Sequence, residues 1–426
     1  MNNLIIITIC SLFFPVLIRF QGKDAMTIGT AAIIALFSVF MIKTLFAEKR
    51  KFALIIIFLT INAGISTVST PAIFMGPSVR SFFQFVSSLL LFFVIINYYG
   101  KAKLEEKNII IEKLLTIIII LFSIQIIIGI LLYYFPEAGH YLTIFTTRTE
   151  DMIATPFASG AKRMRCLIAG GEQLGEGITV LMPFVFYKLI KTQKNIYHIL
   201  LALFTAGVIL TATRSSMLLF LAGFILLYFF NRNTADIRIW FVFINIIMML
   251  FFMALIFFPD TLSPVLNRIN DFFMVYYKTG SLTAAIDRAR VWQKAIEIVL
   301  PNISLFGHGM ISIYGKKSMQ FHNLYLTIMH QIGIVGFFLF FGLLLKIFYY
   351  NFISLKFIEN KYDKSLAISC LISFSILFIN EMKFEFNRMA SYQQIMWLLI
   401  AIFWLTGSFM HEKYSVNPQP DSTSAF

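Results

Sequence analysis

The sequence predicts an all-α fold: a polytopic helical membrane protein of about twelve transmembrane helices, with a large outer loop between helices nine and ten. Three observations predict this class. Of the 426 residues, 59% are hydrophobic and only 13% are charged, about half the usual share of roughly 25% in soluble domains. The mean hydropathy is +0.81. Many separate apolar runs of about 18–25 residues can each cross a bilayer core, whereas a membrane β-barrel would show short alternating segments.

The apolar runs place the expected helices along the chain. The expected spans are 3–20, 25–46, 52–70, 80–99, 108–135, 167–190, 195–212, 214–231, 238–258, 322–350, 363–380 and 391–410. Two long connections cover about 136–166 and 259–321. We interpret 1–410 as one integral-membrane domain and 411–426 as a polar cytoplasmic tail. The first run shows no small-residue cleavage site, so we expect a retained helix rather than a signal peptide.

Lysine-rich short loops indicate the orientation of the chain. With the N-terminus inside, the segments AEKRK, GKAKLEEK, KLIKTQK and NRNTADIR all lie on the cytoplasmic side, as the positive-inside rule requires. Both termini are then inside and both long loops are outside. Topogenic lysine also accounts for the net charge of +14, so no nucleic-acid partner is expected. The three cysteines are scattered and fit neither a metal site nor a disulfide framework.

Arginine is distributed differently from lysine. Most arginines fall in the outer segments, namely Arg19, Arg80, Arg148, Arg163, Arg165, Arg214, Arg268, Arg288, Arg290 and Arg388. A guanidinium group stays charged and presents a fork of donors that matches phosphate or carboxylate. The distribution therefore favours an anion-binding site on the outer face. The alternative is that long outer loops are translocated whatever their charge.

Two arginine-containing stretches stand next to apolar segments. In TATRSSMLLF, Arg214 lies between two spans with almost no loop, which favours a polar cavity or a partner over a snorkelling side chain. In DRARVWQKA, a predicted amphipathic helix on the outer surface carries Arg288 and Arg290. Arg288, Trp292 and Ala295 share one face of that helix, while Arg290 points elsewhere. Solvated arginines on an interfacial helix are the alternative.

Two further stretches carry other ionisable side chains. In FHNLYL, His322 falls at the outer end of a span, where a neutral imidazole suits general base catalysis, with helix capping as the alternative. His330, two turns deeper, is expected to be a core histidine. In RMRCLIAGGEQLGEG, Glu172 and Glu176 share a helical face, which favours either a cavity or pairing with Arg165 or its neighbour Arg163.

In chain order, the motifs are T-R-S-S-M-L-L-F, D-R-x-x-x-W-x-x-A, L-F-G-H-G, F-H-N-x-Y-L and Q-I-G-I-x-G. Together they resemble the O-antigen polymerase (Wzy-type) and O-antigen ligase superfamily of integral-membrane glycosyltransferases, over roughly residues 160–345. The resemblance implies a metal-independent transferase that needs no cofactor and works at the periplasmic face of the bacterial inner membrane. It implies a glycan on undecaprenyl pyrophosphate as donor, and a chain-length regulator is a candidate protein partner.

The resemblance also implies roles for particular residues. His322 would act as the catalytic base, while Arg214 and Arg288 would bind the pyrophosphate, with Arg290 as a second candidate beside Arg288. The further candidates for donor or acceptor contacts are Arg163, Arg165, Glu172, Glu176, Asn323 and Tyr325. One departure is Leu324, which stands where ligases often carry glutamate, and this leaves the acceptor side open.

The preferred function is polymerisation of lipid-linked repeat units into O-antigen or a related surface polysaccharide, because F-H-N-x-Y-L together with L-F-G-H-G is more typical of polymerases. The alternative is an O-antigen ligase that transfers glycan to the lipid A core. A lipid-linked oligosaccharide transporter is less favoured, since transporters tend to show inverted repeats and charges near the midplane. An assembly partner without catalysis is the remaining alternative.

Overall fold

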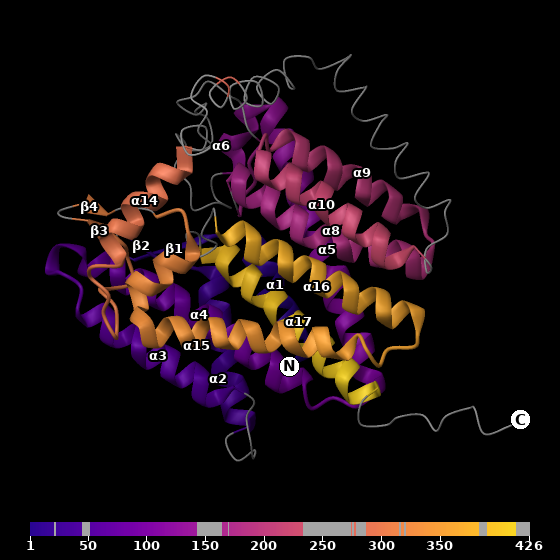
Figure 1. The fold of residues 1–426 in the computed structure, drawn as a ribbon, viewed down its shortest axis with the longest axis horizontal. Helices are drawn as coiled ribbons and strands as arrows, with labels where there is room; N and C mark the ends of the chain where they lie inside the picture. Colours follow the sequence, from indigo (N-terminus) through magenta and orange to yellow (C-terminus); the bar gives the residue numbers. More distant parts are fainter. Residues whose placement is uncertain are drawn as a thin grey trace, which may run out of the picture.

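The computed structural model describes residues 1–20, 23–44, 52–142, 164–168, 170–232, 274, 277, 287–314, 317–318, 321–382 and 390–414. This part of the chain folds mainly into long helices, as predicted (Figure 1). The helices are α1 (Asn2–Phe13), α2 (Ile28–Thr44), α3 (Ala53–Val68), α4 (Met75–Tyr99), α5 (Leu104–Tyr134), α6 (Gly139–Leu142), α8 (Gly171–Thr192), α9 (Asn195–Leu210), α10 (Arg214–Asn231), α14 (Asp287–Val299), α15 (Leu324–Ser354), α16 (Lys361–Glu381) and α17 (Ala390–Tyr414).

Two short antiparallel hairpins accompany the helices. The first pairs β1 (Leu17–Phe20) with β2 (Lys23–Thr27), and the second pairs β3 (Ile313–Tyr314) with β4 (Lys317–Ser318). The first hairpin shortens the span that the sequence predicts at 3–20, because α1 ends at Phe13. Short 3₁₀ turns at Ala72–Phe74 and Pro136–Ala138 lead into α4 and α6.

The described helices include segments suited to crossing a bilayer. Five are long and apolar enough by length and composition: Ala72–Tyr99, Leu104–Tyr134, Leu324–Ser354, Lys361–Glu381 and Ala390–Tyr414. Shorter apolar helices add to them, among them Asn2–Phe13, Ala53–Val68 and Asn195–Leu210. The protein is therefore an integral membrane protein. The span predicted at 238–258 and most of the two long loops lie outside the described residues, so the count of twelve stays a prediction.

Helices α8 and α17 form the centre of the bundle. Their side chains are buried almost without interruption, over 173–190 in α8 and 391–407 in α17. Helix α17 packs against α4, α5 and α15, whereas α8 packs against α9, α10 and α16. A helix whose side chains are buried on all sides lies in the interior of the bundle. Polar side chains on these two helices are consequently shielded from the surrounding lipid.

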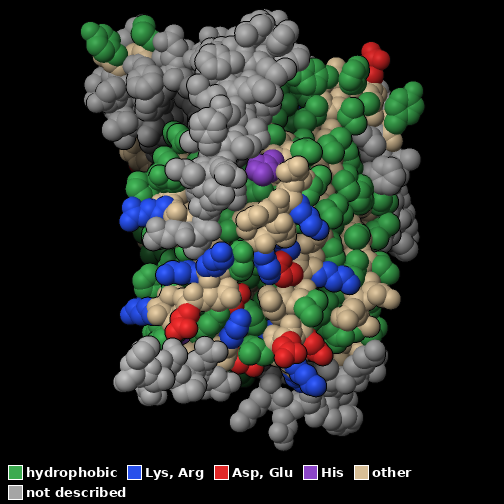
Figure 2. All heavy atoms as spheres, turned by 90° about the vertical axis from the view of Figure 1, so that its right-hand side faces the viewer, with side chains coloured by type: hydrophobic (Ala, Val, Ile, Leu, Met, Phe, Trp, Pro, Cys, Tyr) green, Lys and Arg blue, Asp and Glu red, His purple; other side chains and the backbone are tan. Residues whose placement is uncertain are grey.

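One end of the bundle, which we call the lysine end, gathers ion pairs between neighbouring helices. The pairs are Glu112 with Lys188 and Lys191, Lys107 with Glu412, and Lys413 with Asp363. Figure 2 looks onto this end, where basic side chains cluster together with fewer acidic ones. We call the opposite end the α14 end, because α14 lies there beside the start of α15 (Figure 1).

Candidate functional site

Helix α15 is broken near its start, at the α14 end. Gly333 adopts φ +71°, which is outside the helical region and suits glycine. A Cβ at this position would lie 2.5 Å from the Gly307 nitrogen and 2.5 Å from the Leu305 oxygen. The Ile334 amide just beyond the break donates to the Ser304 carbonyl at 3.0 Å. The segment Ser304–Met310, which we call the glycine loop, thus packs directly onto the break.

The break leaves three consecutive carbonyl groups without partners in their own helix. Inside a membrane protein such groups must find other donors, because an unpaired buried carbonyl is costly. Two donors are side chains of α3 and one is an amide of the glycine loop. The pairs are Asn62 to Ile332, Ser66 to Gln331, and the His308 amide to His330 at 3.0 Å. The broken helix is therefore a built feature rather than a distortion.

The glycine loop is also held by the C-terminal end of α3 and the start of α4. The Gly309 amide donates to Ser66 Oγ at 2.7 Å, and the Met310 amide donates to Ser78 Oγ at 2.9 Å. Gly309 has φ +116°, and a Cβ there would lie 2.0 Å from Thr70 Oγ1. The L-F-G-H-G and Q-I-G motifs are thus two halves of one contact, which explains why both are glycine-rich.

The FHN turn, residues 321–323, forms the entrance to α15. His322 has φ +54°, an uncommon conformation for a residue with a side chain. Asn323 is the N-cap of α15, where its Oδ1 accepts from the Leu326 amide at 3.0 Å. Its Nδ2 donates to the Met382 carbonyl, also at 3.0 Å. The Asn323 side chain therefore ties this turn to the end of α16.

Helix α14 packs against the same turn. The Trp292 indole Nε1 donates to the His322 carbonyl at 3.1 Å. On the same helical face, Ala295 and Val299 are buried against Phe321. These contacts account for the W-x-x-A part of the D-R-x-x-x-W-x-x-A motif. They also bring two motifs that are thirty residues apart in sequence into direct contact.

The two predicted pyrophosphate ligands of α14 are described by their backbone alone. Arg288 and Arg290 occupy its first turn. Arg288 lies one turn before Trp292, so it shares the helical face that meets the FHN turn. Arg290 is rotated about 200° from Arg288 around the helix axis. Helical geometry therefore favours Arg288 for contact with a molecule bound beside His322.

The turn that precedes α10 packs against the start of α8. Arg214 is the first residue of α10, and the structure describes its backbone. Next to it, Thr213 Oγ1 lies 3.4 Å from the Gly171 carbonyl oxygen, to which it donates. A Cβ at Gly175 would lie 2.8 Å from Ser216 Oγ and 2.9 Å from Thr211 Oγ1. Gly175, the first glycine of the G-E-G sequence, thus permits the T-R-S-S turn to approach α8 closely.

The acidic residues of α8 differ in their exposure. Glu172 lies in the first turn and is partly buried, whereas Glu176 is 1% exposed. Arg165 is partly buried next to Met164, whose amide donates to the Leu210 carbonyl at 2.9 Å. Arg163 lies outside the described residues. The Met164 hydrogen bond thus holds the segment before α8 against the end of α9, close to the T-R-S-S turn.

A buried polar cluster at the α14 end was not anticipated from the sequence. Glu381 at the end of α16 is 2% exposed and borders a small apolar pocket together with Tyr325. The Tyr325 hydroxyl donates to the Phe378 carbonyl at 2.9 Å. Tyr392 and Glu176 are likewise buried, at 0% and 1% exposed. The sequence signal for this cluster was Glu381, an acidic residue directly after an apolar run. Its neighbours come from helices that are distant in sequence, so the cluster could not be predicted from that signal.

His330 is buried, as expected of a core histidine, but its polar atoms are unusual. It is 5% exposed, and neither of its ring nitrogens has a hydrogen-bond partner among the described residues. Its ring lies 5.0 Å from that of His308 and 5.3 Å from that of Phe321, between ring centroids. His308 Nε2 lies 2.6 Å from the Asn302 carbonyl oxygen, to which it donates.

The site residues therefore fall into two groups at one end of the bundle. The first comprises the FHN turn, α14 and the glycine loop, and the second comprises the T-R-S-S turn and the start of α8. Helix α16 packs against α8, α10 and α15, so it connects the two groups. Within the described part of the chain, no three His, Cys, Asp or Glu side chains gather as a metal ion would require.

The comparisons with known proteins agree with these motifs. A family model described as O-antigen ligase matches residues 199–341, about a third of the chain. The matched segment includes α10, α14, the glycine loop, the FHN turn and the break in α15. No curated protein matches the chain. Members of the matched family are glycosyltransferase-like enzymes. Residues 199–341 therefore match the O-antigen ligase family model, which belongs to the O-antigen polymerase and ligase superfamily predicted from the motifs.

Proposed function

We propose that this protein is a glycosyltransferase that uses a glycan on undecaprenyl pyrophosphate as donor and acts at the α14 end of the bundle. The contact between Trp292 and His322 carries this proposal. It supports a site that combines a general base with a guanidinium, since Arg288 lies one turn before Trp292 on the helix that packs on the FHN turn. A lipid-linked diphosphate presents its anionic group at the membrane surface, where α14 packs on the start of α15.

The proposed reaction is a displacement at the anomeric carbon of the donor. His322 accepts the proton of the acceptor hydroxyl, whose oxygen forms the new glycosidic bond. The bond between the anomeric carbon and the diphosphate breaks, and the leaving group departs with its electron pair. Arg288 and Arg214 stabilise the negative charge that develops on the diphosphate. Asn323 keeps the FHN turn in place through its two hydrogen bonds.

The orientation of the site follows from charge. The lysine end carries basic residues of the described short loops GKAKLEEK and KLIKTQK, so the positive-inside rule assigns it to the cytoplasm (Figure 2). The α14 end then faces the periplasm from the inner membrane. This placement agrees with a donor whose glycan has already been translocated, and it explains why arginine rather than lysine prevails in the outer segments.

Polymerisation of repeat units is the preferred reaction, and ligation to lipid A core is the second candidate. The F-H-N-x-Y-L form together with L-F-G-H-G favours polymerisation. The description of the matching family model favours ligation. The two reactions share the donor and differ only in the acceptor.

A gel of surface lipopolysaccharide from the native host tests both candidates. Deletion of the gene should leave a core with a single repeat unit and no ladder if the protein is a polymerase. Loss of all O-antigen from the core, with long chains retained on the lipid carrier, would indicate the ligase. Complementation with wild-type protein should restore the ladder, and His322→Asn should not. An unchanged ladder in the deletion strain would contradict both candidates for O-antigen.

A further inference from the structure

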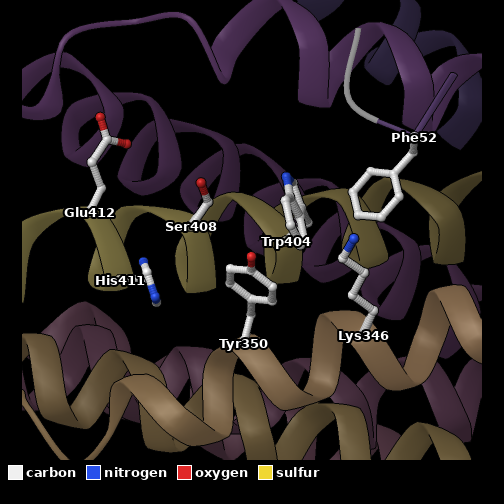
Figure 3. A pocket seen from close by; sticks show the side chains of 7 residues that line it. All are labelled: Phe52, Lys346, Tyr350, Trp404, Ser408, His411 and Glu412. Carbon is white, nitrogen blue, oxygen red and sulfur yellow. The ribbon is translucent and has the colours of Figure 1, made fainter. Parts of the chain in front are cut away.

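A pocket lined by polar and aromatic side chains lies at the lysine end, far along α15 from the FHN turn. It has a volume of about 370 Å³ and lies between α15 and α17, next to the start of α3 (Figure 3). Its lining residues are Phe52, Lys346, Tyr350, Trp404, Ser408, His411 and Glu412. None of them belongs to the groups at the α14 end. The pocket therefore needs an explanation separate from glycosyl transfer.

The charge of the pocket favours an anionic ligand. The Lys346 ammonium lies 5.1 Å from the centre of the Phe52 ring and forms no ion pair with a described carboxylate. The acidic lining residue, Glu412, is already paired with the buried Lys107. Among the described lining residues, Lys346 therefore supplies a positive charge without a carboxylate partner, beside aromatic walls.

The other lining groups add hydrogen-bond donors around that charge. Figure 3 shows Lys346 and Tyr350 extending from α15 toward Trp404 and His411 of α17. The Tyr350 ring centre lies 5.0 Å from that of Trp404 and 5.4 Å from that of His411. A phosphate group accepts hydrogen bonds from hydroxyl, imidazole and ammonium groups alike. The chemistry of the pocket therefore matches a phosphate ester.

The surface next to the pocket distinguishes a lipid from a free phosphate ion. On α15, Phe338, Leu345 and Phe352 recur at intervals of seven residues and are 68%, 59% and 54% exposed. Tyr349, also exposed, extends this apolar stripe beside Tyr350. Acyl chains could lie along the stripe while the headgroup occupies the pocket. Basic pockets between transmembrane helices on the cytoplasmic side recognise anionic headgroups in this way.

We propose that this pocket binds the phosphate headgroup of an anionic phospholipid in the leaflet at the lysine end, with the acyl chains along the α15 stripe. Lys346 supplies the charge, while Tyr350 and His411 supply further donors. The aromatic rings of Phe52 and Trp404 enclose the glycerol region. Such a lipid would join α15 to α17 at the end of the bundle opposite the proposed catalytic site.

Native mass spectrometry of the purified full-length protein tests this proposal. The protein is offered phosphatidylglycerol or phosphatidylcholine, and the retained lipid is counted. The wild type should retain phosphatidylglycerol in preference to phosphatidylcholine. Lys346→Gln should lower retention of phosphatidylglycerol about fivefold, which corresponds to one lysine near an anionic headgroup. Ser408→Leu narrows the pocket without changing charge and should lower retention as well.

Lys356→Gln is the matched control. Lys356 is exposed just beyond the C-terminal end of α15 and does not line the pocket. It should bind lipid like the wild type. Equal retention by the wild type and Lys346→Gln would overturn the proposal. The proposal would also be overturned if the protein retained both lipids equally and millimolar inorganic phosphate displaced them, because the ligand would then be the free ion. Size-exclusion profiles identify variants that have failed to fold.

Discussion

The indole Nε1 of Trp292 donates a hydrogen bond of 3.1 Å to the backbone carbonyl of His322. This bond joins α14, whose first turn contains Arg288 and Arg290, to the turn that carries the proposed catalytic base. Burial of Ala295 and Val299 against Phe321 extends the same interface. The relative position of the proposed anion-binding helix and the proposed base therefore depends on Trp292 together with this packing. The following predictions test this arrangement.

Trp292→Phe keeps most of the ring packing and removes the hydrogen bond to His322. We expect transferase activity to fall about two- to tenfold while the protein still folds, because a typical hydrogen bond contributes about 0.5–1.5 kcal/mol. Transfer from a lipid-linked donor by the purified variant measures the effect. Lys294→Ala, which changes an exposed residue of the same helix, should leave activity unchanged. Equal losses in both variants would contradict a specific role for the indole.

His322→Asn separates the imidazole from the unusual backbone conformation of this position. Asparagine tolerates positive φ better than most residues, so the turn should keep its shape. Loss of a general base should lower the turnover rate by about 10²–10⁴-fold without loss of folded protein. His322→Ala should be equally inactive and less stable. Near-normal turnover in the asparagine variant would exclude His322 as the base.

Arg288→Lys and Arg290→Lys form a matched pair on one helix turn. Only Arg288 shares the face of Trp292, and lysine lacks the planar fork that binds phosphate in two places. We expect Arg288→Lys to reduce turnover about tenfold or more, and Arg290→Lys to reduce it only slightly. Turnover measured at saturating donor provides the comparison. The reverse order would assign the phosphate contact to Arg290.

Gly333→Ala tests whether the break in α15 is structural. A methyl group there would lie 2.5 Å from atoms of the glycine loop, and the site holds its residue at positive φ, which alanine disfavours. We therefore expect a loss of about 2 kcal/mol or more in the free energy of unfolding. Gly342→Ala, in the same helix with nothing within 4 Å, should change stability by less than about 1 kcal/mol. Thermal unfolding in detergent compares them, and similar midpoints would argue against a required break.

The sequence alone predicted the membrane class and most helix positions. Apolar runs long enough to cross a bilayer identify helices because burying them in lipid needs no particular neighbour. The expected spans 80–99, 195–212 and 214–231 lie close to α4, α9 and α10. The motif order likewise predicted the superfamily that the family model matches. The predicted span at 238–258 and the role of Arg163 stay predictions, since they lie outside the described residues.

The tertiary structure decided which of these residues meet. Asn62 and Ser66 of α3 stabilise carbonyl groups of α15 that lie about 270 residues away in sequence. Glu381 and Tyr392 lie at the α14 end of the bundle, although no motif includes them. Hydropathy encodes whether a side chain is buried but not which helix buries it, because that depends on how the helices pack. The sequence by itself therefore determined the helices and the family, and only packing decided that Trp292 lies against His322.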